Sequence, residues 1–275
     1  MVFFNECDIR VNGTGLMAQN ASINSSNSLQ AIRPVGSSDA LELSPNGAIR
    51  NQFSATYYVD LTSDPCFPET TRIKNSTEFE QAEAQVIEVA GISGAFYMTN
   101  YSLSIQENSA IKANVTYQGF GEISGNVTGK TSDASYPESF SGLAHAWTTF
   151  VQSDAGDLDI PVFKFDYNFS NKVQPLYGVG SKNPMQVANL SSEERIRIER
   201  DNSRQMNFYG ESGCALFDAC AQNPRVRIFK LGYLCDDSLT DSMDFDVSGY
   251  RIVSNNTTLD TNDYVKSTFE IRRID

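Results

Sequence analysis

The chain has 275 residues, which is enough for one large domain or for two domains of roughly 130 residues each. Hydrophobic residues make up 40% of the chain and aromatic residues 11%, so a packed core is expected and wholesale disorder is excluded. The formal net charge of -13 argues against a protein that grips nucleic acid, because neutralising phosphate groups requires lysine and arginine.

No run of about 18 apolar residues occurs, so we expect no membrane span. The start of the chain, MVFFNECDIRVNG, has neither the basic segment nor the long apolar segment of a secretory signal. The five cysteines are an odd number and contain no CxxC pair. We therefore expect reduced thiols in a protein that is made in the cytoplasm.

Alternating apolar and polar residues predict several strands in the first half. Residues 9–23 alternate on both sides of a glycine turn at 13–15, and residues 101–117 alternate on both sides of a turn at 107–108, which is typical of a hairpin. Residues 51–61 alternate most regularly, and their apolar side is expected to be buried: Phe53, Ala55, Tyr57 and Val59.

One segment of the first half predicts a helix. In TEFEQAEAQVIEVAG, residues 77–91, the apolar residues Phe79, Ala82 and Val86 lie near helical spacing, and Gly91 follows as a stop. The end of this segment fits a strand equally well, because residues 86–90 also alternate.

The second half contains similar parts. Strands are predicted in PVFKFDYNF (161–169), ERIRIERD (194–201) and PRVRIFKLGYLC (224–235), and a short helix in SGCALFDACAQ (212–222). Residues 247–274 predict a closing hairpin.

Two stretches recur along the chain. NSLQAIRPVGSSD starts at Asn27, and NKVQPLYGVGSKN starts at Asn171, 144 residues later. The closing hairpins also match, since Ser93-Gly94 and Ser248-Gly249 lie 155 residues apart and Lys112 and Lys266 lie 154 apart. Two matched segments in the same order indicate a tandem duplication.

These patterns predict a mainly β protein with two tandem β-sandwich or β-barrel domains, each flanked by one short helix. The first domain is expected at 1–152 with a C-terminal extension, and residues 153–160 (SDAGDLDI) are expected to form an acidic linker. The second domain is expected at 161–275.

No catalytic, cofactor or metal site is predicted. The single histidine, His145, lies beside the only tryptophan, which is more typical of packing than of catalysis. Cys214 and Cys220 do not have the spacing of zinc ligands. The aspartate run within 236–246 contains no glycine that could turn a calcium loop, so a solvated loop is expected there, and the same is expected of the aspartates within 154–159.

The layout resembles the phage tail tube protein family. In the first half the similarity lies in ASINSSNSLQAIRPVGSSD, NGAIRNQFSATYYV and MTNYSLSIQENSAIKANVTYQGF. In the second half it lies in FKFDYNFSNKVQPLYGVGSKNPMQV, ERIRIERDN and VSGYRIVSNNTTLDTNDYVKSTFEI. It covers most of the chain except about residues 121–160, and it rests on strand pattern and small residues.

The resemblance implies a structural virion protein without enzymatic activity. Its tube-type domains would join those of neighbouring copies into stacked rings around a channel, through which DNA passes without specific binding. A duplicated chain would form a ring from three copies with pseudo-sixfold symmetry, and would also contact other tail proteins. An acidic lumen would repel phosphate and let the genome pass.

The resemblance also implies contacts between copies through the closing hairpins and the two matched glycines. The expected contact residues are Tyr101, Leu103, Ile105, Ile111, Val115, Tyr117, Leu259, Val265, Phe269, Ile271, Gly36 and Gly180. Two alternatives stay open: a head decoration, neck or distal-tail protein of the same virion, and a carbohydrate-binding or depolymerase β protein.

Overall fold

The computed structural model describes most of the chain. The described residues are 8–27, 29–36, 38–39, 41–45, 49–59, 64–68, 82–106, 109–127, 147–152, 162–179, 181, 183–201, 225–230, 242–246, 250–258 and 266–274. Every regular element within them is a β-strand, which confirms the prediction of a mainly β protein.

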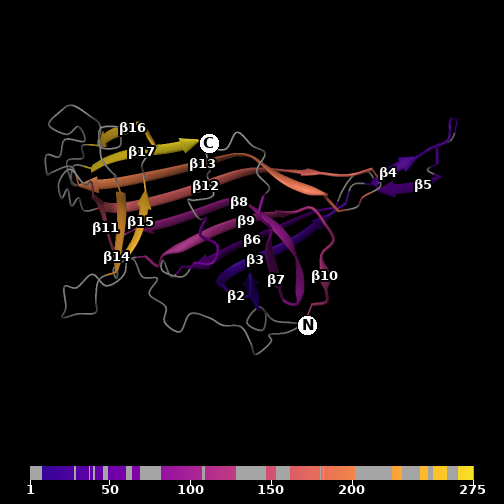
Figure 1. Cartoon of the computed structure of the whole chain (residues 1–275), viewed down its shortest axis with the longest axis horizontal. Coiled ribbons are helices and arrows are strands. Elements are labelled where there is room, and N and C mark those ends of the chain that lie inside the picture. Colours follow the sequence, from indigo (N-terminus) through magenta and orange to yellow (C-terminus); the bar gives the residue numbers. More distant parts are fainter. Residues whose placement is uncertain are drawn as a thin grey trace.

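Eight of the described strands form one antiparallel row in the order β3-β6-β9-β8-β12-β13-β17-β16 (Figure 1). Their bounds are β3 Met17–Ser26, β6 Arg50–Tyr58, β9 Lys112–Gly119, β8 Ile92–Gln106, β12 Val162–Leu176, β13 Gln186–Asp201, β17 Lys266–Ile274 and β16 Arg251–Thr258. The hairpin predicted at 101–117 is confirmed as part of β8 and β9.

A smaller sheet branches from the start of β8. There β8 pairs with β7 (Gln85–Val89) on one side and β10 (Ser124–Gly125) on the other, and β7 pairs in turn with β1 (Ile9–Val11), which pairs with β2 (Thr14–Gly15). Two-residue turns with positive φ close β1–β2 at Asn12-Gly13 and β7–β8 at Ala90-Gly91. This geometry matches the right-handed twist of the strands that it joins.

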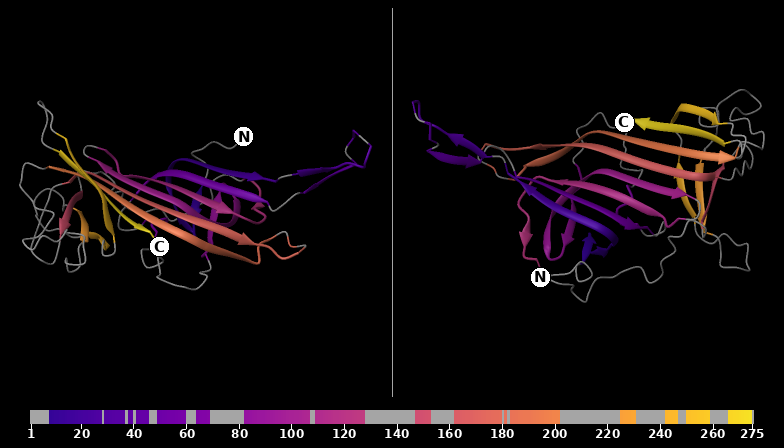
Figure 2. Two further views of the ribbon diagram at one scale, coloured as in Figure 1. Left: turned by 90° about the horizontal axis from the view of Figure 1, so that it is seen from above. Right: turned by 180° about the vertical axis from the view of Figure 1, so that it is seen from behind.

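Five further strands complete the described structure. β4 (Leu29–Ile32) and β5 (Glu42–Pro45) extend the β3–β6 hairpin outward, as Figure 2 shows. β11 (Trp147–Gln152), β14 (Arg225–Lys230) and β15 (Ser242–Asp246) form a separate three-stranded sheet. Residues 147–152, expected at the end of the first domain, thus pair with a strand of the second half.

The core lies between the apolar face of the long row and the small sheet. The predicted inward residues of β6 and its end, Phe53, Ala55, Tyr57 and Val59, are all buried. They pack in one cluster with Ile9 and Val11 of β1 and Ile87 of β7. The cluster continues across the row through Tyr167, Ile196 and Ile271, so the core runs without interruption from the first half into the second.

Of the helix and the strand that both fitted the end of the segment 77–91, the strand is confirmed, since residues 85–89 form β7. Val86, Ile87 and Val89 are β-branched, and β7 is paired on both sides, by β1 and β8. Tertiary pairing of this kind decides the outcome where both periodicities fit. The other predicted helix, 212–222, and the predicted linker, 153–160, lie outside the described residues.

The pairing of the first four strands of the row recurs in the last four. In the β3–β6 pairing Gln19 has no partner residue opposite it, and in the β12–β13 pairing Phe163 has none. Phe163 lies 144 residues after Gln19, the same distance as between the repeated stretches. In the β8–β9 pairing Thr99 has no partner residue opposite it, and in the β16–β17 pairing Val253 has none. Val253 lies 154 residues after Thr99, the same distance as between Lys112 and Lys266. The two sets therefore share their strand order, their register and two β-bulges.

The central pairs agree with this correspondence. Phe53↔Tyr117 joins β6 to β9, and Ile196↔Ile271 joins β13 to β17 in the matching place. The stretch that recurs in the sequence, 27–39 and 171–183, lies at the outer end of a long hairpin in each half. Both hairpins run toward the same end of the molecule (Figure 2).

Candidate functional site

The two ends of the long row are strand edges. Among the described residues, β3 pairs with β6 on one side, and β16 pairs with β17 on one side. The side chains that alternate along β3 on the outer face are small and polar, and Asn20, Ser22, Asn24 and Ser26 are exposed. An edge of unpaired N–H and C=O groups is a template for pairing with another strand.

The junction between the two halves shows what such an edge pairs with. β8, the last strand of the first set, pairs with β12, the first strand of the second set, from Asn100↔Ser170 to Gln106↔Lys164. Beneath the junction, the rings of Tyr101 and Tyr167 lie 6.1 Å apart, and Phe67 contacts both at 5.5 Å. Above it, Ser104 Oγ donates a hydrogen bond to Asp166 at 2.6 Å.

The outer face of the row is polar along its whole length. β3, β6, β8 and β9 present mainly Asn, Ser, Thr and Gln there, whereas β12, β13 and β17 present charged residues. A depression of about 410 Å³ lies over the junction and is lined by Asn100, Tyr101, Ser102, Asn168, Phe169, Ser170, Glu193 and Arg195. Its two charged residues are 3.2 Å apart and neutralise each other.

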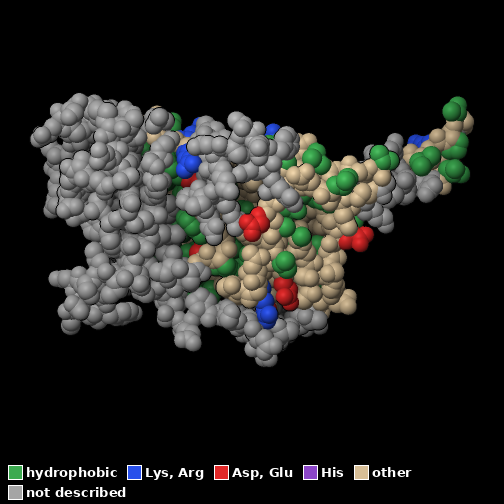
Figure 3. Space-filling view, in the orientation of Figure 1, with side chains coloured by type: hydrophobic (Ala, Val, Ile, Leu, Met, Phe, Trp, Pro, Cys, Tyr) green, Lys and Arg blue, Asp and Glu red, His purple; other side chains and the backbone are tan. Residues whose placement is uncertain are grey.

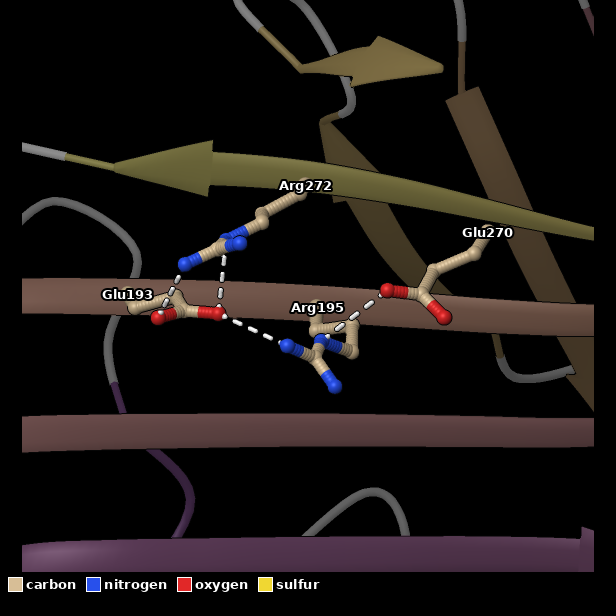
Figure 4. Close-up of polar contacts among 4 residues, drawn as sticks. All are labelled: Glu193, Arg195, Glu270 and Arg272. Carbon is tan, nitrogen blue, oxygen red and sulfur yellow. Dashed lines mark hydrogen bonds and ion pairs between the residues drawn. The ribbon is translucent and has the colours of Figure 1, made fainter. Parts of the chain in front are cut away.

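The charges of this face form ion pairs, four members of which are drawn in Figure 4. Glu193 contacts Arg272 at 2.7 Å and Arg195 at 3.2 Å, and Arg195 also contacts Glu270 at 3.1 Å. Asp166 lies 3.1 Å from Lys164, and Glu199 lies 3.8 Å from Lys266. These pairs are partly exposed, so each contributes little to stability.

The acidic balance of the chain is therefore not concentrated on this face. The described carboxylates of this face, on Asp166, Glu193, Glu199 and Glu270, each have a cationic partner. The expected phosphate-repelling surface is instead, over the described side chains, a surface of neutral amides, hydroxyls, ion pairs and further cations such as the exposed Arg197.

A buried polar cluster anchors residues 64–68 to the core. The Asp64 carboxylate accepts hydrogen bonds from Tyr57 Oη at 2.8 Å, from Tyr101 Oη at 2.7 Å and from the Cys66 backbone N–H at 2.9 Å. Burial raises the pKa of Asp64, in spite of these hydrogen bonds, and raises the pKa of the Cys66 thiol to about 12. Both tyrosines are buried and donate to Asp64, so the cluster acts as a structural anchor.

Most of the predicted contact residues lie inside the chain. Both sides of β8, β9 and β17 are paired, and the following side chains are buried: Tyr101, Leu103, Ile105, Ile111, Val115, Tyr117 and Ile271. Phe269 lies in β17 opposite Ile198 and Asn255. These side chains therefore lie in the core of one chain, whereas the strands that end the described row are β3 and β16.

The remaining predicted residues are divided. Gly36 lies exposed at the outer end of the β4–β5 hairpin with a φ of 89°. Gly180, Leu259 and Val265 lie outside the described residues, as do His145, Cys214 and Cys220. The sequence signal that bears on the edges is the repeat itself, because equivalent strands of the two copies, β8 with β16 and β12 with β3, hold equivalent places in the row.

Three further features bear on function: metal sites, membrane helices and similarity to known proteins. Among the described residues, no group of three or more His, Cys, Asp or Glu side chains is arranged to hold a metal ion. The described part of the chain contains no helix that is long and apolar enough to span a membrane. No protein-family model matches the chain, and no curated protein is significantly similar to it.

Proposed function

We propose that the chain is a structural subunit that polymerises through its two free strand edges, most specifically a duplicated phage tail tube protein. Three copies would form a ring of six similar units, and stacked rings would enclose a channel for DNA. The observation that carries the proposal is the β8–β12 junction, because a chain built from two equivalent sets of strands contains one copy of the contact that it would repeat between chains.

The repeat predicts the pairing between chains. Residues of β8 match residues of β16 that lie 154 positions later, which is the distance between Lys112 and Lys266. Residues of β12 match residues of β3 that lie 144 positions earlier, which is the distance between Asn27 and Asn171. The internal pairs Ser104↔Asp166, Ser102↔Asn168 and Asn100↔Ser170 then become Thr258↔Ser22, Asn256↔Asn24 and Ser254↔Ser26 between neighbours. Such a contact is head-to-tail, and head-to-tail contacts make closed rings when the rotation closes.

The polar face supports the second part of the proposal. Phosphate binding needs uncompensated Lys and Arg, whereas Lys164, Arg195, Lys266 and Arg272 of this face are each held by a carboxylate. A channel lined by this face would let DNA slide without holding it. In this proposal the repeated units are residues 8–127 and 147–274, since β11 pairs with β14 of the second half.

Assembly is tested first on the purified protein. Light scattering and negative-stain electron microscopy at high protein concentration and physiological salt are expected to show rings of three chains with a central hole, and stacks of such rings. A stable monomer under these conditions would contradict the proposal.

The predicted register is tested by paired cysteines. Asn24→Cys with Asn256→Cys is expected to give disulfide-linked chains under mild oxidation, whereas Ser102→Cys with Asn168→Cys, the matching pair of the internal junction, links only within one chain. Ser22→Cys with Ser254→Cys is the control, because these positions are out of register by about 13 Å, which is too far for a disulfide. Equal linking of both intermolecular pairs would contradict the register.

A further inference from the structure

We propose that the hairpin of β4 and β5 docks onto the second half of a neighbouring copy, against β16 and β17. This inference rests on the proposed ring, and it names a second surface that assembly would bury in addition to the paired edges. The template is again found within one chain, where the matching hairpin of the second half docks onto the first half.

The outer part of the β12–β13 hairpin packs against the first half. Val187 is buried with Ala82 and Phe120, and the partly buried side chains of Tyr97 and Val173 pack against them. The backbone N–H of Ala82 donates to the Val187 carbonyl at 2.8 Å. These contacts form a small apolar core of their own beside the main one.

Polar contacts hold the same hairpin in place. Tyr177 Oη donates a hydrogen bond to the Phe120 carbonyl at 3.2 Å, and Asn171 Nδ2 donates to the Met98 carbonyl at 3.5 Å. A Cβ atom at Gly121 would come within 3.1 Å of Asn183 Oδ1, so the outer end of the hairpin also lies close to the end of β9. The docking surface is therefore formed by the start of β8, the end of β9 and Ala82.

Among the described residues, the β4–β5 hairpin has no such support within the chain. It projects from the body in every view, and among the described strands it pairs only within itself (Figures 1 and 2). Two of its larger apolar side chains are exposed, Ile32 at 46% and Leu41 at 77% of full exposure. Figure 3 shows hydrophobic side chains gathered on this projection.

The two hairpins correspond residue by residue. Each strand pair of β4–β5 matches a pair of β12–β13 that lies 144 residues later. Leu29↔Pro45 matches Val173↔Asn189, and Ile32↔Glu42 matches Leu176↔Gln186. By the same interval Leu43 holds the position of Val187, Arg33 that of Tyr177, and Asn27 that of Asn171. Each of the three keeps the needed chemistry, because Leu is apolar, Arg donates hydrogen bonds and Asn is unchanged.

The partner that fits is a second copy of this chain. The part of the receiving surface that belongs to β8 and β9 has its equivalents in β16 and β17 of the second set of strands. When β3 of one chain pairs with β16 of the next, β4–β5 continues from β3 over that surface. Asn27 would then donate to the Ile252 carbonyl and Arg33 to the Ile274 carbonyl, as Asn171 and Tyr177 do within the chain.

A photo-crosslink tests this contact in chains that carry Asn24→Cys and Asn256→Cys. p-Benzoylphenylalanine replaces Arg33, and equal amounts of isotopically light and heavy chains are mixed, oxidised, irradiated, digested and analysed by mass spectrometry. The expected adducts join a peptide containing residue 33 to residues 250–274 of another chain. The same probe at Tyr177 is the control, with adducts expected at residues 96–98 or 119–121 of its own chain.

The outcomes separate the two proposals. Disulfide-linked chains without adducts at residues 250–274, or with adducts elsewhere, overturn the docking of the hairpin and leave the edge pairing intact. Absence of linked chains overturns both. As a second measurement, Leu43→Asp is expected to lower the yield of linked chains about tenfold without changing the melting of the monomer, because docking would bury an unpaired charge at this position. An unchanged yield contradicts the inference.

Discussion

Thr99 in β8 and Val253 in β16 are both skipped by the ladder to the next strand, and they hold equivalent positions in the two closing hairpins. The pairs beside them also match, since Met98 faces Tyr117 and Ile252 faces Ile271. A bulge bends its strand and increases the local twist. Alternating apolar and polar residues occur in any half-buried strand, whereas a β-bulge occurs at one particular position of a strand. A bulge at the same position in both hairpins therefore strongly supports a duplicated unit.

The first prediction concerns charges across the proposed edge contact. Asn24 and Asn256 are both exposed, and the predicted register places them opposite each other. Asn24→Lys with Asn256→Lys is expected to prevent ring formation, because like charges directly opposite on paired strands repel. Asn24→Lys with Asn256→Glu is expected to restore it. Sedimentation velocity of the two double variants and of Asn24→Lys alone measures the effect.

Salt provides the control for that prediction. High salt is expected to rescue the double-lysine variant in part, because the screening length falls to about 3 Å at 1 M ionic strength, which is shorter than the roughly 5 Å between opposite side chains of paired strands. Identical sedimentation of the Lys/Lys and Lys/Glu variants would show that residues 24 and 256 do not face each other. Circular dichroism of both variants should match that of the unchanged chain, since neither side chain is buried.

The second prediction concerns DNA. Glu193→Gln with Glu270→Gln removes the carboxylates that neutralise Arg195 and Arg272 on the polar face. Assembled rings of this variant are expected to bind short duplex DNA roughly tenfold more tightly at low salt, with a steeper salt dependence, because freed cations displace counterions from phosphate. Fluorescence anisotropy over a salt series measures both quantities.

A control variant with the same net charge as Glu193→Gln with Glu270→Gln tests whether the position of the carboxylates matters. Glu88→Gln with Glu122→Gln removes two carboxylates from outside the eight-stranded row, on β7 and in the segment before β10. These changes are expected to leave DNA binding nearly unchanged. Equal tightening by both double variants would mean that overall charge, rather than the polar face, controls the interaction.

The third prediction concerns pH. Burial raises the pKa of Asp64 above its ordinary value of 3.8, so the folded chain binds this proton more tightly than the unfolded chain does. The resulting stabilisation is complete below pH 3.8 and is lost as the pH rises through the folded-state pKa. The free energy of unfolding of the unchanged protein, relative to Asp64→Asn, is therefore expected to fall as the pH rises from 3.8.

Urea unfolding at a series of pH values measures this difference. A difference that grows with pH would show that the carboxylate form is the stabilised one and would contradict the effect of burial. Asp64→Ala is expected to have a lower free energy of unfolding than Asp64→Asn at every pH, by on the order of 2 kcal/mol. The reason is that the hydroxyls of Tyr57 and Tyr101 lose their hydrogen-bond acceptor.

The fourth prediction compares two glycines with positive φ. At Gly125, whose φ is 106°, an added Cβ would lie 2.1 Å from the Gly91 carbonyl oxygen, whereas at Gly13, whose φ is 84°, no atom lies within 4 Å. Gly13→Ala is expected to cost about 1 kcal/mol from backbone strain alone. Gly125→Ala is expected to cost more, because β10 must also separate from β8. Equal losses in thermal unfolding would contradict the steric difference.

The local pattern was sufficient to predict many elements of the fold. The alternation in residues 51–59 and 194–198 identified the strands β6 and β13 and their buried faces, because side chains on a strand point to opposite sides in turn. The same pattern was ambiguous in residues 85–89, where the helical and strand periods both fit and only the pairing with β1 and β8 decided the outcome.

The sequence by itself determined that the chain is built from strands and that two of its segments are repeated, since both are properties of residue order. Only the tertiary structure decided which strands are neighbours. The pairing of Ser102 with Asn168 joins segments far apart in the chain, and no local pattern specifies it. That pairing buries Tyr101 and Leu103 in the core and leaves β3 and β16 as edges, because a backbone ladder satisfied within the chain has no groups left to offer a neighbour.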